Sequence, residues 1–228
     1  MTGPEVDLVA AYGYPLPITV ISELIGVPLE LRDDFQRLTQ IVITGPVHPP
    51  RVYVDAATDM VTLIRGMIND KRATPTGDLL SDLVRVHDGG DSLTEDELTS
   101  MVFLLIGAGH ETTVSLVVLG AHALLTHPDQ LDRVRTDPEL IPAAVEEVLR
   151  YDSPVMVAIP SNTAGDVQVG DTTIPAGEVV VPVLSTANRD AKKFERPDEF
   201  DIARPDSAHI SFGHGIHHCL GAPLARLE

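Results

Sequence analysis

The chain has little cysteine, little aromatic residue and little positive charge. Its 228 residues contain one cysteine, no tryptophan and 4% aromatic residues. A single cysteine excludes an intrachain disulfide, and together with the lack of a recognisable export signal it favours a reducing cytoplasm. Sixteen lysines and arginines stand against 34 aspartates and glutamates, a formal net charge of −18. That charge argues against nucleic acid or an anionic membrane as a partner.

The rest of the composition is that of an ordinary globular protein. Apolar residues make up 43% of the chain and charged residues 22%, which excludes a disordered chain. The longest apolar stretch, residues 101–125, has the length of a membrane span. Polar residues 110–113 interrupt it at mid-length, where a spanning helix is most apolar, so we expect it to form the centre of a folded protein. We find no linker-like segment and expect one domain.

Hydrophobic spacing, proline and glycine predict a mainly helical protein with a small β-sheet. The longest expected helix opens at a capping box, with Thr94 as N-cap and Glu97 at N3. After residue 154 the period changes to two, which predicts short strands followed by an irregular meander from 188 to 207. The expected helices cover residues 17–26, 29–43, 52–72, 79–86, 95–126, 128–135 and 142–151, and the expected strands lie near 167–169, 174 and 179–184.

Ten residues near the end of the chain surround the lone cysteine. They read Phe212-Gly213-His214-Gly215-Ile216-His217-His218-Cys219-Leu220-Gly221. Cys219 precedes a predicted helix start at residue 222, where free backbone N–H groups favour a thiolate over a thiol. Glycines let a large flat ligand approach the backbone. A thiolate in such a loop is what cysteine ligation of haem iron requires, whereas a lone cysteine elsewhere is usually a small buried apolar residue.

The spacing Phe-Gly-x-Gly-x-His-x-Cys-x-Gly resembles the haem-binding loop of the cytochrome P-450 family. The resemblance implies that Cys219 is the proximal ligand of the iron in haem b, that His217 lies near a haem propionate and that Phe212 packs by the thiolate. The six matching positions are Phe212, Gly213, Gly215, His217, Cys219 and Gly221.

A rival interpretation makes the same loop a zinc site. It would take ligands from His214, His217, His218 and Cys219. Structural zinc sites usually draw their ligands from two separated pairs, and the sequence offers no second pair.

A second motif interrupts the long apolar helix, at Ala108-Gly109-His110-Glu111-Thr112-Thr113. Glycine weakens a helix by about 1 kcal/mol relative to alanine. Thr112 can bond back to a carbonyl one turn earlier, which we expect to open the helix locally. The motif resembles the family's oxygen-activation motif, which implies that Ala108 and Gly109 lie beside the haem. It also implies that Thr112 holds dioxygen and that Glu111 belongs to a proton relay.

The alternative for this motif is purely structural. Thr112 would then be tucked onto its own backbone, and Glu111 would form an ion pair.

Glu147 and Arg150 lie three residues apart on one expected helix. Their order between the two motifs matches the family's Glu-x-x-Arg pair, which pins the meander to the core. The family often has an arginine where this chain has Glu199, so Arg204 is the candidate third member. Ser161 also stands where the family commonly has an arginine bonding a haem propionate, which leaves His217 as the propionate partner.

The three motifs occur in the family's order, so we expect residues 1–228 to form a partial cytochrome P-450 fold without the family's N-terminal region and extreme C-terminus. The resemblance implies a cytoplasmic haem-dependent monooxygenase that inserts one oxygen atom of O2 into a C–H bond of an apolar small molecule, in secondary metabolism. Electrons would come from a ferredoxin-type partner, and residues 207–227, which lack carboxylates, could face it. The alternatives are a non-catalytic haem-thiolate sensor and an inactive fragment, and we expect the fragment alone to be inactive.

Overall fold

A computed structural model describes residues 5–90, 93–205 and 207–228. The chain forms two compact units, Met1–Val114 and Ser115–Glu228. The division falls inside one helix, α5 (Glu95–Thr126), so the two units share that helix and no linker separates them. The sequence predicts one partial domain over residues 1–228, and that stays a prediction.

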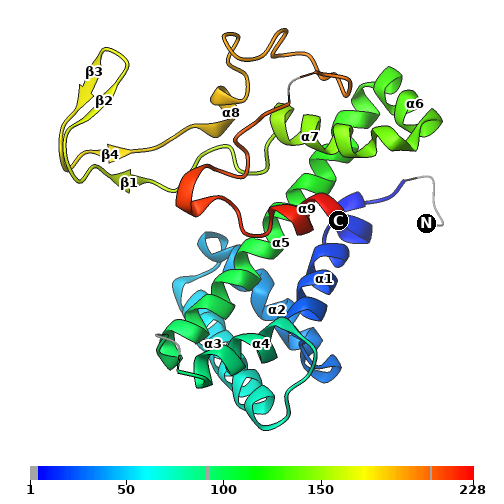
Figure 1. Ribbon diagram of the computed structural model, residues 1–228. Coiled ribbons are helices and arrows are strands. Elements are labelled where there is room, and N and C mark those ends of the chain that lie inside the picture. The colour runs from blue at the N-terminus through cyan, green and yellow to red at the C-terminus, as the bar shows by residue number, and fades with distance from the viewer. Residues whose placement is uncertain (1–4, 91–92, 206) are drawn as a thin grey trace. The chain divides into compact units, whose positions relative to one another are not determined.

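The first unit is a bundle of helices around the N-terminal half of α5 (Figure 1). Its core consists of apolar residues from all of these helices, among them Ile18, Phe35, Met60, Leu80 and Leu98. The helices are α1 (Pro15–Ile25), α2 (Arg32–Ile43), α3 (Pro50–Ala73) and α4 (Leu79–Asp88), with a π-helical turn η1 (Val9–Gly13) and 3-10 turns η2 (Leu29–Leu31) and η3 (Gly45–Val47).

Gly26 ends α1 in a conformation that requires glycine. Its φ is +78°, and a Cβ there would lie 2.1 Å from Oδ2 of Asp78. Asp78 in turn caps α4 by accepting a bond of 2.8 Å from the Ser81 N–H, and it pairs with Lys71 at 2.5 Å. Burial works against the Asp78 charge, but the hydrogen bonds from Lys71, Thr76 and Ser81 outweigh it and lower its pKa to about 2.

The second unit combines helices with two small sheets and a long meander (Figure 1). β1 pairs antiparallel with β4, Ser161 opposite Val180, and β2 pairs antiparallel with β3, Val167 opposite Ile174. The elements are α6 (Pro128–Thr136), η4 (Pro138–Leu140), α7 (Ile141–Tyr151), β1 (Ser161–Asn162), β2 (Val167–Val169), β3 (Thr172–Ile174), β4 (Val179–Val180), α8 (Leu184–Ala187), η5 (Gly215–His217) and α9 (Ala222–Leu227). The core residues are Leu116, Ala123, Ala144, Val148, Leu149, Phe200 and Ile202.

The predicted mainly helical fold class with small sheets is confirmed. The predicted capping box of α5 is also confirmed, because the Glu97 N–H donates to the Thr94 hydroxyl at 3.2 Å and the Glu97 carboxylate accepts from the Thr94 N–H at 2.7 Å. The Thr94 hydroxyl also donates to the Glu97 carboxylate at 2.8 Å, and the bonds that this carboxylate accepts from the Thr94 N–H and hydroxyl lower the pKa of Glu97.

Several boundaries differ from the prediction. The first helix begins at Pro15, two residues early, because proline is tolerated at the first position of a helix. The strand expected over 179–184 ends at Val180. Pro182 has no N–H for a sheet, and the buried Leu184 starts the helical turn α8. The strand β1 and the turn η5 are additional.

By length and composition α5 could cross a membrane. Its apolar side chains instead join two buried clusters. Leu98, Val102 and Ile106 belong to the core of the first unit, and Leu116 and Ala123 belong to the core of the second. These are the contacts of a core helix, as the interrupted apolar pattern predicts.

Candidate active site

The loop from Phe212 to Gly221 folds back on itself to display its cysteine. The Cys219 N–H donates to the Phe212 carbonyl at 2.8 Å, and the His218 N–H donates to the Gly215 carbonyl at 3.1 Å, closing η5. Gly213 and Gly215 have φ values of +75° and +77°, which a side chain would strain. The thiol of Cys219 is free and exposed at the resulting turn.

The surroundings of this thiol fit a haem. Ile216 and Leu220 are 97% and 87% exposed, so they offer apolar surface beside it. A Cβ on Gly221 would lie 3.9 Å from Sγ, in contact with the sulfur itself. A thiolate is a soft ligand suited to iron, and one cysteine suffices for haem. His217 is exposed on the same loop, within the turn η5.

Zinc fits less well. Across the described residues, no three side chains of histidine, cysteine, aspartate or glutamate gather closely enough to hold a metal ion. The four residues of the rival zinc interpretation, His214, His217, His218 and Cys219, therefore form no such group.

The second motif lies on the part of α5 that belongs to the first unit. The Thr112 hydroxyl donates to the Ala108 carbonyl at 2.7 Å. The local opening expected of this bond does not occur, since α-helical hydrogen bonding continues through residues 95–126. Glu111 and Thr112 are both exposed, so neither is committed to the core.

Gly109 has a packing reason of its own. A Cβ there would lie 3.0 Å from Cδ1 of Ile21, so glycine lets α1 approach α5 closely. Ala108 lies beside it and supplies the carbonyl that Thr112 uses. The predicted contacts of these two residues with haem stay predictions.

Two residues to which the sequence assigns no role meet on the buried side of the motif, one inside it and one on an earlier segment of the first unit. His110 is fully buried, and its ring lies edge-on to that of Tyr14, with centroids 4.6 Å apart. Burial lowers the pKa of His110, so the ring is neutral at neutral pH. Burial, and next the charge of Glu111, raise the pKa of Tyr14. His110 stands inside the motif, but its burial follows from tertiary packing.

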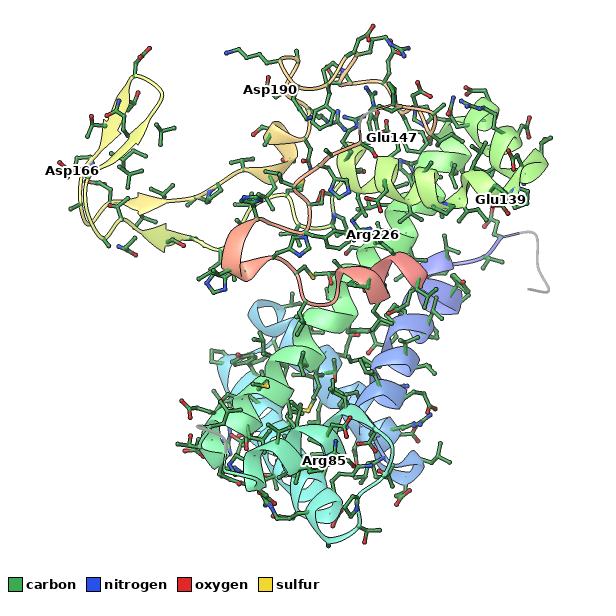
Figure 2. All side chains as sticks on the ribbon, in the orientation of Figure 1. Arg85, Glu139, Glu147, Asp166, Asp190 and Arg226 are labelled. Atoms are coloured by element: carbon green, nitrogen blue, oxygen red, sulfur yellow. The ribbon has the colours of Figure 1, made fainter. Side chains whose placement is uncertain are left out.

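Glu147, labelled in Figure 2, forms a buried, two-point ion pair with Arg150 in the second unit. Nε and Nη2 of Arg150 each donate to the Glu147 carboxylate at 2.8 Å. The rest of the guanidinium donates to three carbonyls of the meander, those of Asn188, Pro197 and Glu199, at 3.0, 2.8 and 3.0 Å. The structure therefore brings the predicted pair together and ties the meander to α7.

Arg204 completes this cluster, while the Glu199 side chain stays outside it. Nε of Arg204 donates to the Glu147 carboxylate at 3.2 Å, and its side chain is 6% exposed. Its remaining N–H groups donate to the carbonyls of Glu195, Arg196 and Glu199. The Glu199 carboxylate instead pairs with the exposed Arg196 at 2.6 Å.

Comparison with known proteins decides the family. The family model of cytochrome P450 matches residues 50–228. The chain belongs to the cytochrome P450 family. Two curated relatives from Saccharopolyspora erythraea illustrate the likeness. Cytochrome P450 107B1 is 50% identical over 98% of this chain and 55% of its own length. The 6-deoxyerythronolide B hydroxylase is 43% identical over 98% of this chain and 55% of its own length.

Solved structures agree with the sequence relatives. Ligand-free P450 monooxygenase TamI superposes with a TM-score of 0.90 at 46% identity, covering 98% of this chain and 54% of that one. The predicted resemblance and the predicted partial P450 fold are thus confirmed. The chain spans about half the length of the P450 relatives it matches.

Ser161 is the residue that the sequence places at an expected arginine position, and that placement stays a prediction. It is exposed in β1, opposite Val180. A serine hydroxyl carries no charge and reaches less far than a guanidinium, so it supplies neither the positive charge nor the paired N–H donors of an arginine.

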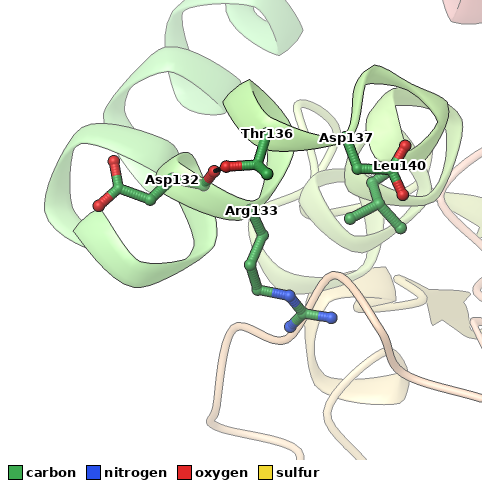
Figure 3. Close-up of a pocket in the computed structure, with 5 residues that line it drawn as sticks. All are labelled: Asp132, Arg133, Thr136, Asp137 and Leu140. Atoms are coloured by element: carbon green, nitrogen blue, oxygen red, sulfur yellow. Dashed lines mark hydrogen bonds between the residues drawn. The ribbon is translucent and has the colours of Figure 1, made fainter.

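A hollow of about 340 Å3 opens between α6 and η4, away from the P450 motifs in sequence (Figure 3). The Thr136 hydroxyl donates to the Asp132 carbonyl at 2.7 Å beside it. None of the predicted site residues lines this hollow, so we assign it no part in the site. The lining residues are Asp132, Arg133, Thr136, Asp137 and Leu140.

Proposed function

We propose that this chain is part of a haem-dependent monooxygenase in which Cys219 holds the iron of haem b. The observation that carries the proposal is the free, exposed thiol at the turn of a glycine loop, in a chain of the P450 family. When bound, a thiolate-ligated haem would supply dioxygen activation: with two electrons from the donor and two protons, one oxygen atom of O2 would enter a C–H bond of an apolar small molecule and the other would leave as water.

The loop residues hold and shield this site. The bond from the Cys219 N–H to the Phe212 carbonyl fixes the cysteine backbone. We assign Phe212 to packing beside the thiolate, and the exposed His217 can donate a hydrogen bond to a haem propionate. Gly213 and Gly215 keep the loop turned, because a side chain would strain their positive φ, and we assign Gly221 to the haem contact beside them.

We assign proton delivery to Thr112 and Glu111 of α5. A hydroxyl has one hydrogen, and Thr112 gives it to the Ala108 carbonyl at 2.7 Å. The lone pairs of Oγ1 can still accept a hydrogen bond, so Thr112 can orient a proton donor in this orientation of its hydroxyl. To donate its own hydrogen, the hydroxyl must rotate away from the Ala108 carbonyl. The exposed Glu111 carboxylate exchanges protons with solvent and can supply them at this position.

The proposed partners are a ferredoxin-type electron donor and an apolar substrate. Residues 207–227 contain no carboxylate, although the chain carries a net charge of −18, so an acidic donor meets least repulsion there. The hydroxylase of 6-deoxyerythronolide B among the relatives supports a secondary-metabolism substrate of the same class. We assign the protein to the cytoplasm on its lone unpaired cysteine.

The reduced, carbon monoxide-bound spectrum of the full-length protein tests this proposal. Thiolate-ligated haem has its own band position, and zinc has no spectrum in this region. We expect the thiolate band in the natural protein and its loss in C219S, because a neutral hydroxyl is a poor ligand for iron.

The variants H214A and H218A serve as controls, since a zinc site would need these imidazoles and a haem-thiolate site would not. Both should keep the thiolate band. An unchanged spectrum in C219S would show that another residue binds the iron. A natural protein that shows the band but consumes no NADPH with any apolar substrate would favour the sensor over the enzyme.

A further inference from the structure

One carboxylate beside the buried pair connects two helices of the second unit. Glu146 lies on α7 immediately before Glu147, and it accepts two hydrogen bonds from Arg226 of α9, the residue labelled in Figure 2. The distances are 2.5 Å from Nε to Oε1 and 3.1 Å from Nη2 to Oε2. This two-point geometry fixes the plane of the guanidinium. Glu146 therefore holds the helix that follows the cysteine.

The same carboxylate accepts a third bond, from His209. Nε2 of His209 lies 3.1 Å from Oε2 of Glu146, and the histidine side chain is 3% exposed. The Ser211 N–H donates to Nδ1 at 3.2 Å, so the ring proton is on Nε2 and points at Glu146. Burial lowers the pKa of His209, although Glu146 opposes that shift, and the ring is neutral at neutral pH.

Arg226 and His209 both contact the first residue of the cysteine loop. The guanidinium carbon of Arg226 lies 4.4 Å from the centroid of the Phe212 ring, a cation–π contact. The ring centroids of His209 and Phe212 are 5.9 Å apart. The carbonyl of Phe212 accepts the 2.8 Å bond from the Cys219 N–H. A continuous chain of contacts thus runs from Glu146 to the backbone of the cysteine.

An ordinary surface ion pair would not carry such a role, because exposed pairs contribute little. The Glu146 side chain is 27% exposed, and its histidine partner is buried. Burial disfavours the Glu146 charge, but the bonds and charge of Arg226 outweigh burial and lower the pKa of the carboxyl group. Glu146 is therefore charged at neutral pH and makes all three bonds at once.

We propose that Glu146 is a positioning residue for Cys219, acting by holding Arg226 and His209 against the Phe212 ring. This inference rests on the proposed function, because it takes Cys219 as the iron ligand. The two neighbouring glutamates then have different tasks. Glu147 fixes the meander through Arg150 and Arg204, and Glu146 fixes the loop that the meander leads into.

The test uses the full-length holoprotein and the variant E146Q. Substituting a residue that orients a metal ligand typically lowers metal affinity by about 10–100-fold. We therefore expect haem to dissociate faster from E146Q by a factor in that range. Hydrogen exchange at the Cys219 amide should accelerate as well, because its bond to Phe212 loosens. The same substitution in an R226Q background should add less, since Glu146 acts in part through Arg226, and the remainder reports the bond from His209.

Two controls separate positioning from stability. V148A removes buried apolar volume from the same helix without touching the carboxylate, and E139Q removes an exposed carboxylate just before it. Both should leave Cys219 amide exchange unchanged. If E146Q does not fold, R226K is measured in its place, because lysine keeps the charge but cannot make the two-point contact.

The outcomes distinguish this inference from the function on which it rests. A natural protein without the thiolate band would overturn both. A natural protein with the band, together with an E146Q variant that matches E139Q in haem loss and amide exchange, would overturn the positioning role alone. Equal acceleration of haem loss by V148A and E146Q at equal melting temperature would do the same.

Discussion

The guanidinium of Arg150 and the carboxylate of Glu147 meet in two parallel hydrogen bonds of 2.8 Å, and both side chains are buried. An arginine has five N–H groups, and all five of Arg150 are used. The three that remain after Glu147 reach carbonyls 38, 47 and 49 residues further along the chain. One side chain therefore secures a segment that has almost no regular structure.

The first prediction concerns Arg150. R150K in the full-length protein should lower the free energy of unfolding by about 3–5 kcal/mol, because lysine cannot satisfy a buried carboxylate and three carbonyls from one ammonium group. Urea denaturation measures the loss. R196K is the matched control, since the Arg196 side chain is 55% exposed and its ion pairs contribute about 0–1 kcal/mol. A loss for R150K as small as that of the control would contradict the role assigned here.

The second prediction concerns Arg204. R204A should lower the free energy of unfolding by about 1–3 kcal/mol, because it leaves part of the Glu147 carboxylate and several carbonyls without donors. The substitution E199Q tests the alternative position of the third member. Because the Glu199 carboxylate pairs only at the surface, E199Q should cost less than R204A, and the reverse order would place the third member at residue 199.

Residues close in sequence could be predicted well. The helix boundaries follow local spacing, and the capping box of Thr94 and Glu97 depends on residues three apart. The glycine loop around Cys219 is likewise local, and its motif resembles that of the P450 family, which the comparisons confirm. Such features depend on backbone geometry that a few residues determine.

Contacts between distant residues could not be predicted in the same way. Arg204 is only a candidate third member of the buried cluster from the sequence, because nothing local shows that it reaches Glu147, 57 residues earlier. Glu146 looks like an ordinary surface residue until α9 packs against α7 and brings Arg226 to it. The haem contact that the resemblance implies for Gly109 stays a prediction, and local sequence does not show that Gly109 also lies against Ile21 of α1. Tertiary packing decides each of these roles.

The third prediction concerns Thr112. T112A in the full-length protein should leave haem binding intact while more of the NADPH consumed yields peroxide and less yields product, because proton delivery loses its hydroxyl. T126A is a close control on the same helix. Its hydroxyl donates to the His122 carbonyl at 2.8 Å, much as Thr112 donates to Ala108 at 2.7 Å. Equal coupling in T112A and T126A would rule out a special role for Thr112.

The fourth prediction concerns the buried His110. Its pKa in the folded protein lies below the unfolded value of about 6.5, so below that pH the unfolded chain takes up a proton that the folded protein refuses. Stability therefore falls as pH falls, by up to about 1.4 kcal/mol per pH unit for this group. H110F should reduce that slope between pH 6.5 and 5 and change stability little above pH 7.

Thermal and urea unfolding of the full-length protein across this pH range would measure the slope. The exposed His214 supplies the control, since H214F removes a histidine that solvent already surrounds. His209, whose pKa is also lowered by burial, remains in both variants and contributes equally to both curves. If H110F keeps the slope of the natural protein, His110 takes up its proton while folded.

The last prediction concerns residues 1–228 expressed by themselves. Large apolar side chains of the second unit are exposed in this chain, including Ile159 at 87%, Ile216 at 97% and Leu227 at 84%. At about 25 cal/mol per Å2, each few hundred Å2 of apolar surface left uncovered forfeits several kcal/mol, which is comparable to the net stability of a whole domain. The helix α9 covers only six residues, too few to be stable without packing. Ser161 also supplies no charge for a haem propionate.

We therefore expect the 228-residue chain, purified with excess haem, to bind less than one haem per chain and to unfold over a broad temperature range, whereas the full-length protein binds one and unfolds sharply. Full occupancy with a sharp transition in the short chain would show that this half of a P450 holds haem without the other.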